Sequence, residues 1–280
     1  MSVIQVGLVD KSGRLDPKLV QATAAALNIQ AMRDLTQFWN VRATVQYLPD
    51  PNRIPVGVWP VFLVAKLPPG EGGVHLDKKN QPYSLVIGTP ASNDWTIDAS
   101  HETLEMLVDP AGNRLQTSRA IKTVGKSTAD TAGEFEYLVE VCDPCEANQY
   151  AYSIQGIAVS DFITPHFYDP VATSGTRYSF GGNIQKPRQI LSGGYISFAD
   201  PQSDEWQQIL FPPLMGPKPV LRNLGPANGL SLRVFVDRHK GTNDLVDKGQ
   251  KPNHALSKWT TAHRAVVEKA ALYRAESYWK

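Results

Sequence analysis

The first ninety residues alternate short apolar runs with one long amphipathic segment. Apolar residues dominate residues 3–9, 58–67 and 83–87, and residues 41–48 alternate between apolar and polar, so these four segments are predicted to be strands. Residues 17–38, which follow the first of them, carry an apolar stripe at helical spacing and predict a long helix. This order of elements predicts a mixed sheet backed by helices.

A second helix is predicted soon after the last of these strands. Asp98 and Ser100 are suited to cap its start, and Pro110 stops it after Asp109. Its apolar residues recur at helical spacing, which indicates that one side packs on the sheet: Ile97, Leu104, Leu107 and Val108.

This second helix carries the pentad His101-Glu102-Thr103-Leu104-Glu105. Residues four apart on a helix have Cβ atoms about 5–6 Å apart, so His101 and Glu105 can bind one ion. Glu102 then lies beside that ion without binding it. The alternative is a solvated helix that carries these side chains without using them. We favour a metal site, because the pattern is rare by chance in a chain with only six histidines.

Residues 98–107 resemble the active-site helix of the zincin metallopeptidases, with Glu105 in place of the second histidine of His-Glu-x-x-His. Residues 140–146, Glu-Val-Cys-Asp-Pro-Cys-Glu, are similar to a second block of zincin-like proteins of the His-Glu-x-x-Glu type. The resemblance covers the N-terminal half of the chain. It implies an α+β fold with a zincin-like mixed sheet, a backing helix and an active-site helix, and it implies hydrolysis of peptide bonds in a peptide or protein substrate.

In this interpretation His101 and Glu105 bind a zinc ion, and Glu102 is the general base for a water bound to it. Zinc suits nitrogen and carboxylate ligands, and a catalytic site needs three protein ligands. Two anionic ligands cancel the charge of the ion and leave the water less acidic, so Glu102 carries more of the work.

For the third ligand we favour Glu140, because the alternation of residues 138–142 lets its carboxylate point off one face of a strand. Asp143 and His166 are the alternatives, and either could instead orient His101 through its other ring nitrogen. A plain exposed strand residue is the alternative for Glu140 itself.

The aromatic segment at residues 162–168 could line the site, with His166 or Tyr168 donating a hydrogen bond to a developing oxyanion. Such clusters also occur simply as hydrophobic core. Three other histidines lie in polar surroundings and are expected at the surface: His75, His239 and His254.

Both cysteines of the chain fall in Cys142-Asp143-Pro144-Cys145. A redox pair, half of a thiolate zinc site and two incidental thiols are the possible interpretations. A four-cysteine zinc site is excluded by the count. The polar residues that follow give little helical pattern, so local structure beside the metal site is favoured over a thiol redox protein.

The second half of the chain is less regular. Short strand-like runs are predicted at 135–141, 152–159, 178–183, 190–198 and 230–236, a surface loop at 211–229, and a closing amphipathic helix at 253–280. We expect a zincin-like metal-binding domain at residues 1–170 and a C-terminal region at 171–280 that packs on it.

The net charge of +1 argues against a nucleic-acid partner, and no apolar run is long enough to span a membrane. The N-terminus has no basic region and no small-residue cleavage site, so synthesis as a soluble cytoplasmic chain is expected, with leaderless export left open. The main alternative to an enzyme is a non-catalytic binding or assembly protein that keeps the zincin-like scaffold. The sequence leaves the substrate's identity and the oligomeric state open.

Overall fold

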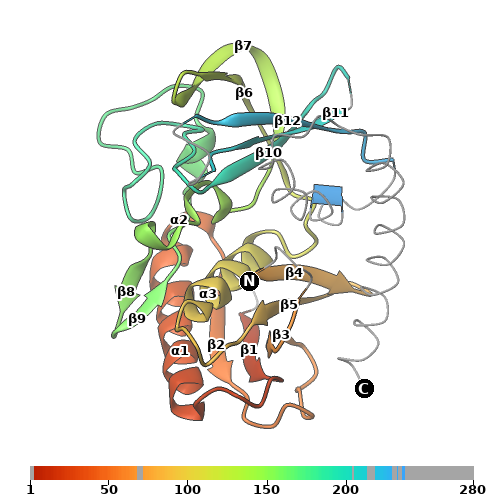
Figure 1. The fold of residues 1–280 in the computed structure, drawn as a ribbon, viewed down its shortest axis with the longest axis vertical. Coiled ribbons are helices and arrows are strands. Elements are labelled where there is room, and N and C mark those ends of the chain that lie inside the picture. Colours follow the sequence, from red (N-terminus) through yellow and green to blue (C-terminus); the bar gives the residue numbers. More distant parts are fainter. Residues whose placement is uncertain are drawn as a thin grey trace.

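The computed structural model describes residues 3–67, 72–203, 205–212, 218–228, 232, 235 and 236. Within them the chain forms a mixed α/β structure with three sheets (Figure 1). The helix predicted at 253–280 lies outside the described residues, as do His239 and His254.

The first sheet contains five strands in the order β2-β1-β3-β5-β4. β2, β1, β3 and β5 pair in parallel, whereas β4, at one edge, runs antiparallel to β5. Its strands are β1 (Ile4–Asp10), β2 (Ala43–Tyr47), β3 (Val58–Val64), β4 (Gly73–Lys78) and β5 (Gln81–Ile87). The predicted mixed sheet is confirmed, and β4 is the strand that the hydrophobic pattern missed.

The long helix predicted at 17–38 is present, but part of it is π-helical instead of α-helical. It consists of α1 (Pro17–Ile29), a π-helical stretch at Gln30–Leu35 and the short α2 (Thr36–Trp39). Asp16 caps its start by accepting a hydrogen bond from the Lys18 amide at 2.9 Å. It ends at Asn40, which adopts a left-handed conformation with φ of 51°.

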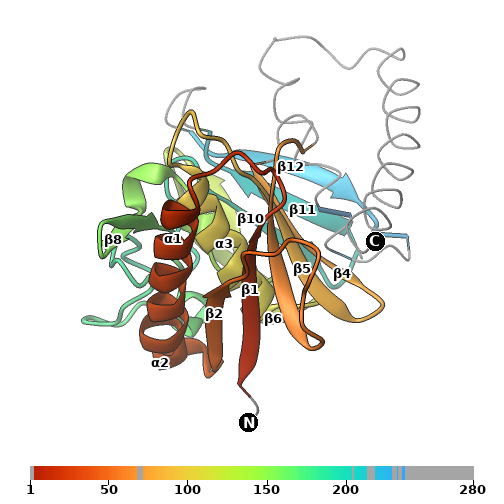
Figure 2. The ribbon, with the colours of Figure 1, turned by 90° about the horizontal axis from the view of Figure 1, so that it is seen from below.

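The pentad lies on α3 (Trp95–Val108), and the predicted end of this helix before Pro110 is confirmed. The predicted caps are wrong, because the helix begins a turn earlier after Asp94 and encloses Asp98 and Ser100. The Ser100 hydroxyl instead donates to Gln30 Oε1 at 2.7 Å. Figure 2 shows α1 and α3 side by side against the sheet, where apolar residues of both join one hydrophobic core.

A second, antiparallel sheet has the order β12-β11-β10-β7-β6. Its strands are β6 (Leu115–Val124), β7 (Ser127–Leu138), β10 (Tyr195–Asp200), β11 (Glu205–Leu210) and β12 (Val220–Gly225). β7 and β10 pair across the boundary predicted at residue 170, so this sheet draws on both predicted parts. The division into 1–170 and 171–280 stays a prediction.

Several strand predictions in the second half need correction. Residues 152–159 form a hairpin of β8 (Tyr152–Ile154) and β9 (Ile157–Val159), because Gln155 and Gly156 have positive φ and turn the chain. Residues 178–183 contribute only one isolated bridge, Ile163 with Ser179. The predicted loop at 211–229 contains β12. The described residues of 230–236 are helical, not extended: Leu232, Phe235 and Val236.

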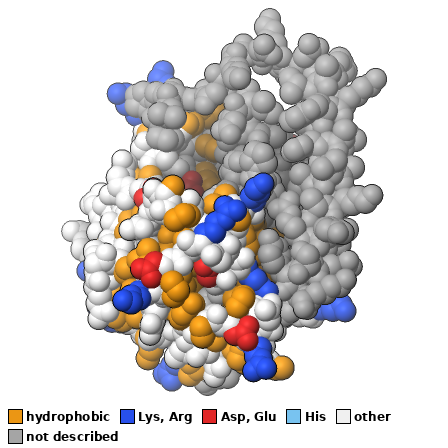
Figure 3. Space-filling view, turned by 60° about the horizontal axis from the view of Figure 1, so that its bottom comes forward, with side chains coloured by type: hydrophobic (Ala, Val, Ile, Leu, Met, Phe, Trp, Pro, Cys, Tyr) orange, Lys and Arg blue, Asp and Glu red, His pale blue; other side chains and the backbone are white. Residues whose placement is uncertain are grey.

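Charged side chains are scattered over the face drawn in Figure 3. Lys and Arg side chains lie there among Asp, Glu and hydrophobic ones, without a continuous basic stripe on the part that the structure describes. No helix within the described residues is long and apolar enough to cross a bilayer.

Candidate metal centre

The three titratable side chains of the pentad, all on α3, are buried. His101 is 8% exposed, Glu102 3% and Glu105 0%. The predicted geometry of the pair is present, because His101 Nε2 lies 3.2 Å from Glu105 Oε2 across one helical turn. Carboxylates are rarely buried to this degree unless they are paired or bind a metal.

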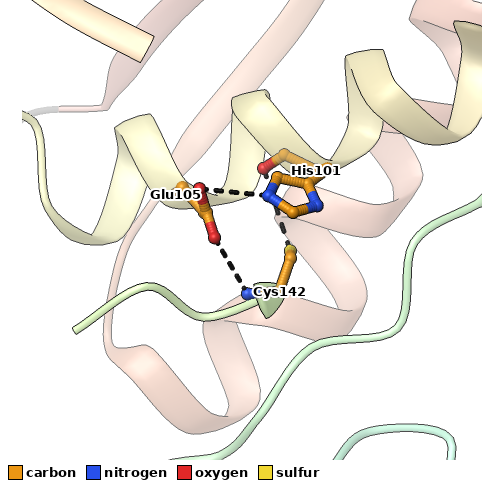
Figure 4. Close-up of side chains that lie close together, drawn as sticks. All are labelled: His101, Glu105 and Cys142. Carbon is orange, nitrogen blue, oxygen red and sulfur yellow. Dashed lines mark hydrogen bonds and ion pairs between the residues drawn. The ribbon is translucent and has the colours of Figure 1, made fainter. Parts of the chain in front are cut away.

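Residues 139–145, which we call the crossing segment, follow β7 and contact α3. The Val141 carbonyl accepts a hydrogen bond from the Ile163 amide at 2.7 Å, and a 3₁₀ turn at Asp143–Cys145 follows. The Cys142 amide donates to Glu105 Oε1 at 3.2 Å, and the Cys142 thiol lies 3.8 Å from the His101 carbonyl oxygen. Figure 4 shows His101 and Glu105 projecting from α3 towards Cys142 on this crossing segment.

Asp143 enters the cluster from the 3₁₀ turn and is 1% exposed. Its Oδ1 lies 3.2 Å from His101 Nε2, and no hydrogen bond from the described residues reaches its Oδ2. The turn is packed closely from behind: a Cβ on Gly194 would lie 2.6 Å from the carbonyl oxygens of Asp143 and Pro144. The Leu191 amide also donates to the Pro144 carbonyl at 2.9 Å.

Glu140 lies on the same segment, just beyond the end of β7, and is 5% exposed. One ligand atom from each of Glu105, Glu140 and Asp143 falls within 4.8 Å of the other two. A second group of this kind contains His101, Glu105 and Cys142, and a third contains His101, Asp143 and Glu146. The described residues therefore form a buried cluster of His, Glu, Asp and Cys side chains that could hold a metal ion.

The expectation that His75 lies at the surface is wrong. His75 is on β4 with 0% exposure, and its Nδ1 lies 3.5 Å from Glu102 Oε2 and 3.6 Å from Glu105 Oε2. On β4, Gly73 and His75 face α3, whereas Val74 belongs to the hydrophobic cluster on the other face. This two-residue alternation could have predicted from the sequence that His75 faces α3. It is hard to recognise, because the strand is short and contains charged residues.

A polar network supports α3 directly before His101. Gln30, in the π-helical stretch, accepts from Ser100 and donates to the Ser160 carbonyl at 2.9 Å and to Tyr152 Oη at 3.1 Å. The Ser160 amide donates to the Ser100 hydroxyl at 2.9 Å. π-helical stretches often mark functional sites, and this one fixes the helix turn that carries His101.

Electrostatics sets the protonation of the cluster. Burial lowers the pKa of His101, but Glu105 and Asp143 outweigh it, so this pKa lies well above its ordinary value. Burial raises the pKa of Asp98, one turn before Glu102, to about 6. A bound cation would displace the proton of His101, because only the neutral imidazole is a ligand.

The two predicted oxyanion donors differ in position. Tyr168 is buried, and burial followed by the charge of Glu140 raises the pKa of its hydroxyl well above the ordinary value. The His166 side chain is 55% exposed and pairs with Asp169 at 2.8 Å. None of the metal-capable groups among the described residues contains His166.

The two cysteines are free thiols and buried. Burial, followed by Glu105 for Cys142 and by Asp161 for Cys145, raises the pKa of each thiol well above its ordinary value. Reactive cysteines need a lowered pKa and access to solvent, so this environment favours a local structural role.

Comparisons with models of protein families, with curated proteins and with solved structures gave no match.

Proposed function

We propose that the protein is a zinc-dependent hydrolase with a zincin-like site, in which His101, Glu105 and a carboxylate of the crossing segment hold the ion. The observation that carries the proposal is the buried contact of His101 Nε2 with both Glu105 Oε2 and Asp143 Oδ1, each at 3.2 Å. Glu102, on the next helical position, is available as the base.

The residues fit a zinc ion. With Zn–N and Zn–O bonds of about 2.0–2.2 Å, two ligands of a tetrahedral site lie about 3.3–3.6 Å apart, close to the two contacts of His101. Asp143 Oδ2 is a buried oxygen that no hydrogen bond from the described residues satisfies. Glu140 or Asp143 supplies the third ligand, and the other of the two remains beside it. A zinc ion held there polarises a carbonyl group and acidifies water.

The side chains of this chain then have separate tasks. Glu105 fixes the position of the Cys142 amide, so the crossing segment stays against α3. Glu102 accepts the proton of the attacking water and returns it to the leaving amine, as a general base and then acid. In this proposal Tyr168, a buried residue of the 3₁₀ turn at Pro165–Tyr168, would donate a hydrogen bond to a developing oxyanion.

The proposal of a peptide substrate rests on the zincin resemblance and is supported by β4. This strand forms an edge of the first sheet in the described residues and contacts the site through His75. An extended peptide can add to such an edge through backbone hydrogen bonds. A peptide or protein substrate therefore suits the position of the site.

The experiment compares His101→Ala and Glu102→Gln. We expect about one zinc per chain in the purified protein, loss of that zinc in His101→Ala, and retention of it in Glu102→Gln. Glu102→Gln keeps size and hydrogen bonding but removes the proton acceptor, so hydrolysis of a fluorogenic peptide library should fall by roughly 10²–10⁴. His166→Ala is the matched control, because it removes an exposed histidine. Zinc retained in His101→Ala would remove the basis of the proposal.

A second function is favoured by one observation, the depth of burial. Among the side chains of the cluster, Glu105 is 0% and Asp143 1% exposed, so the metal could serve a non-catalytic binding or assembly protein as a structural ion. Cobalt substitution separates the two: an absorption spectrum that changes with added hydroxamate indicates an open coordination position, and an unchanged spectrum indicates a closed site.

A further inference from the structure

His75 on the edge strand β4 contacts two glutamates of α3 and the residue that caps the end of this helix. Its ring lies between the Asp109 carbonyl oxygen, 3.2 Å from Nε2, and the carboxylates of Glu102 and Glu105, 3.5 and 3.6 Å from Nδ1. The side chains of His75, Glu102 and Glu105 are nearly or fully buried. One ligand atom from each of these three lies within 4.8 Å of the other two.

The Asp109 carbonyl decides the tautomer of His75. A carbonyl oxygen only accepts hydrogen bonds, so Nε2 carries a proton and donates it. In the neutral ring Nδ1 then presents a lone pair towards two carboxylates. Histidines that bind metals show this pattern, in which one ring nitrogen donates to a backbone carbonyl and the other faces the ion.

The two distances at Nδ1 fit ligands of one cation better than hydrogen bonds. A charged N–H donor and a carboxylate oxygen lie about 2.7–2.9 Å apart, which is shorter than the 3.5 and 3.6 Å found here. Two ligands of a tetrahedral zinc lie about 3.3–3.6 Å apart. The distances from His75 Nδ1 to the Glu102 and Glu105 carboxylates are therefore those expected between ligands of one metal ion.

The charge of the cluster points in the same direction. Glu102, Glu105, Glu140 and Asp143 are at most 5% exposed, and buried carboxylates are costly unless cations offset them. One divalent ion beside His101 offsets two of the four charges. A second divalent ion beside His75 offsets the other two.

We propose that His75, Glu102 and Glu105 form a second site for a divalent cation of the zinc type, with the Glu105 carboxylate shared between the two sites. A consequence rests on the function proposed above: an ion bound at this second site uses the Glu102 carboxylate as a ligand. Glu102 then no longer accepts a proton, so filling the second site switches hydrolysis off.

Gly73 explains how the strand comes near enough. A Cβ at this position would lie 2.6 Å from Glu102 Cγ and 2.8 Å from Glu102 Oε1. A glycine lets the backbone of β4 lie directly over Glu102, and His75, two residues on, reaches the same side of the strand. The second site is thus assembled between one strand and one helix.

The test is a zinc titration of the chelator-stripped chain against a chromophoric chelator. We expect two equivalents in the wild type, one tight and one weaker. His75→Phe, His75→Gln and Glu102→Gln should each keep the tight equivalent and lose the weaker. His101→Ala should lose the tight one, and His166→Ala, the control, should keep both. Circular dichroism checks the folding of each variant, and Glu102→Gln keeps the test decisive if both His75 variants fail to fold.

Each outcome separates this proposal from the function on which its consequence rests. A single equivalent that His101→Ala removes and His75→Phe leaves would overturn the second site and keep the first. Two equivalents that persist in His75→Phe and Glu102→Gln would also overturn it. If the wild type binds no zinc, the proposed hydrolase fails as well. Where peptide hydrolysis is detected, excess zinc should inhibit the wild type and leave the residual activity of His75→Gln unchanged.

Discussion

At the scale of single residues, the cluster is defined by acids on two separate segments that meet the same histidine. His101 contacts Glu105 on its own helix and Asp143 on the crossing segment, both at 3.2 Å. The sequence predicts the first contact, because both residues lie on one helix four positions apart. The contact of His101 with Asp143 depends on how residues 139–145 pack against α3, and no local sequence pattern predicts this packing.

The third ligand can be ranked by mutation. Glu140→Gln and Asp143→Asn each remove one anionic ligand while keeping the size of the side chain. The one that binds the ion should lose zinc affinity by more than the roughly 10- to 100-fold that is typical of residues behind the ligands. We expect Asp143→Asn to do the most damage, because Asp143 Oδ1 lies 3.2 Å from His101 Nε2, and we expect His166→Ala, on an exposed side chain, to change nothing. Competition with a zinc chelator measures all three. A larger loss in Glu140→Gln would make Glu140 the third ligand.

At the scale of elements, the two long helices and the four parallel strands of the first sheet are predictable from the sequence, and the antiparallel edge strand β4 is not. Residues 17–38 and α3 each carry enough turns of apolar periodicity to determine the element, although caps and the π-helical stretch escape. β4 is short, begins with glycine and carries Asp and Lys, so its sequence has little of the apolar pattern that predicts a strand. Its position over α3 arises from pairing with β5 and from the space left by Gly73.

The contact of β4 with Glu102 gives a prediction at this scale. Gly73→Ala places a methyl group 2.6 Å from Glu102 Cγ, so the carboxylate must shift. We expect zinc content to stay near one per chain and peptide hydrolysis to fall by about 10- to 100-fold, because displacement of a reacting group by about 1 Å can cost this much. Gly72→Ala is the control, since its methyl group meets Asp98 Oδ2 at 3.2 Å instead. Equal activity in the two variants would show that β4 does not position Glu102.

At the scale of the whole molecule, the site depends on contacts between distant parts of the chain. β7 of the second sheet delivers residues 139–145 to α3, and the loop before β10 holds the turn at Asp143 from behind. The local spacing of residues predicts α3. The pairing of β7 with β10 joins segments about sixty residues apart, so local spacing does not predict it. Such pairings follow from the packing of the whole fold, which explains why the second sheet and the role of its loops were not predicted.

Gly194 tests whether this distant support matters for the metal. In Gly194→Ala the new Cβ would lie 2.6 Å from the carbonyl oxygens of both Asp143 and Pro144, which are backbone atoms that cannot rotate away. We expect a loss of about 1–3 kcal/mol in the free energy of unfolding, and a fall of roughly 10- to 100-fold in zinc affinity as Asp143 moves from His101. Gly88→Ala is the matched control: its Cβ meets Leu15 at 2.9 Å and Leu63 at 3.1 Å, so it crowds the core beside the first sheet instead. Chemical denaturation and zinc competition should show both variants destabilised but only Gly194→Ala weakened in zinc binding. Equal zinc affinity in the two would mean that the loop before β10 stabilises the fold without setting the geometry of the site.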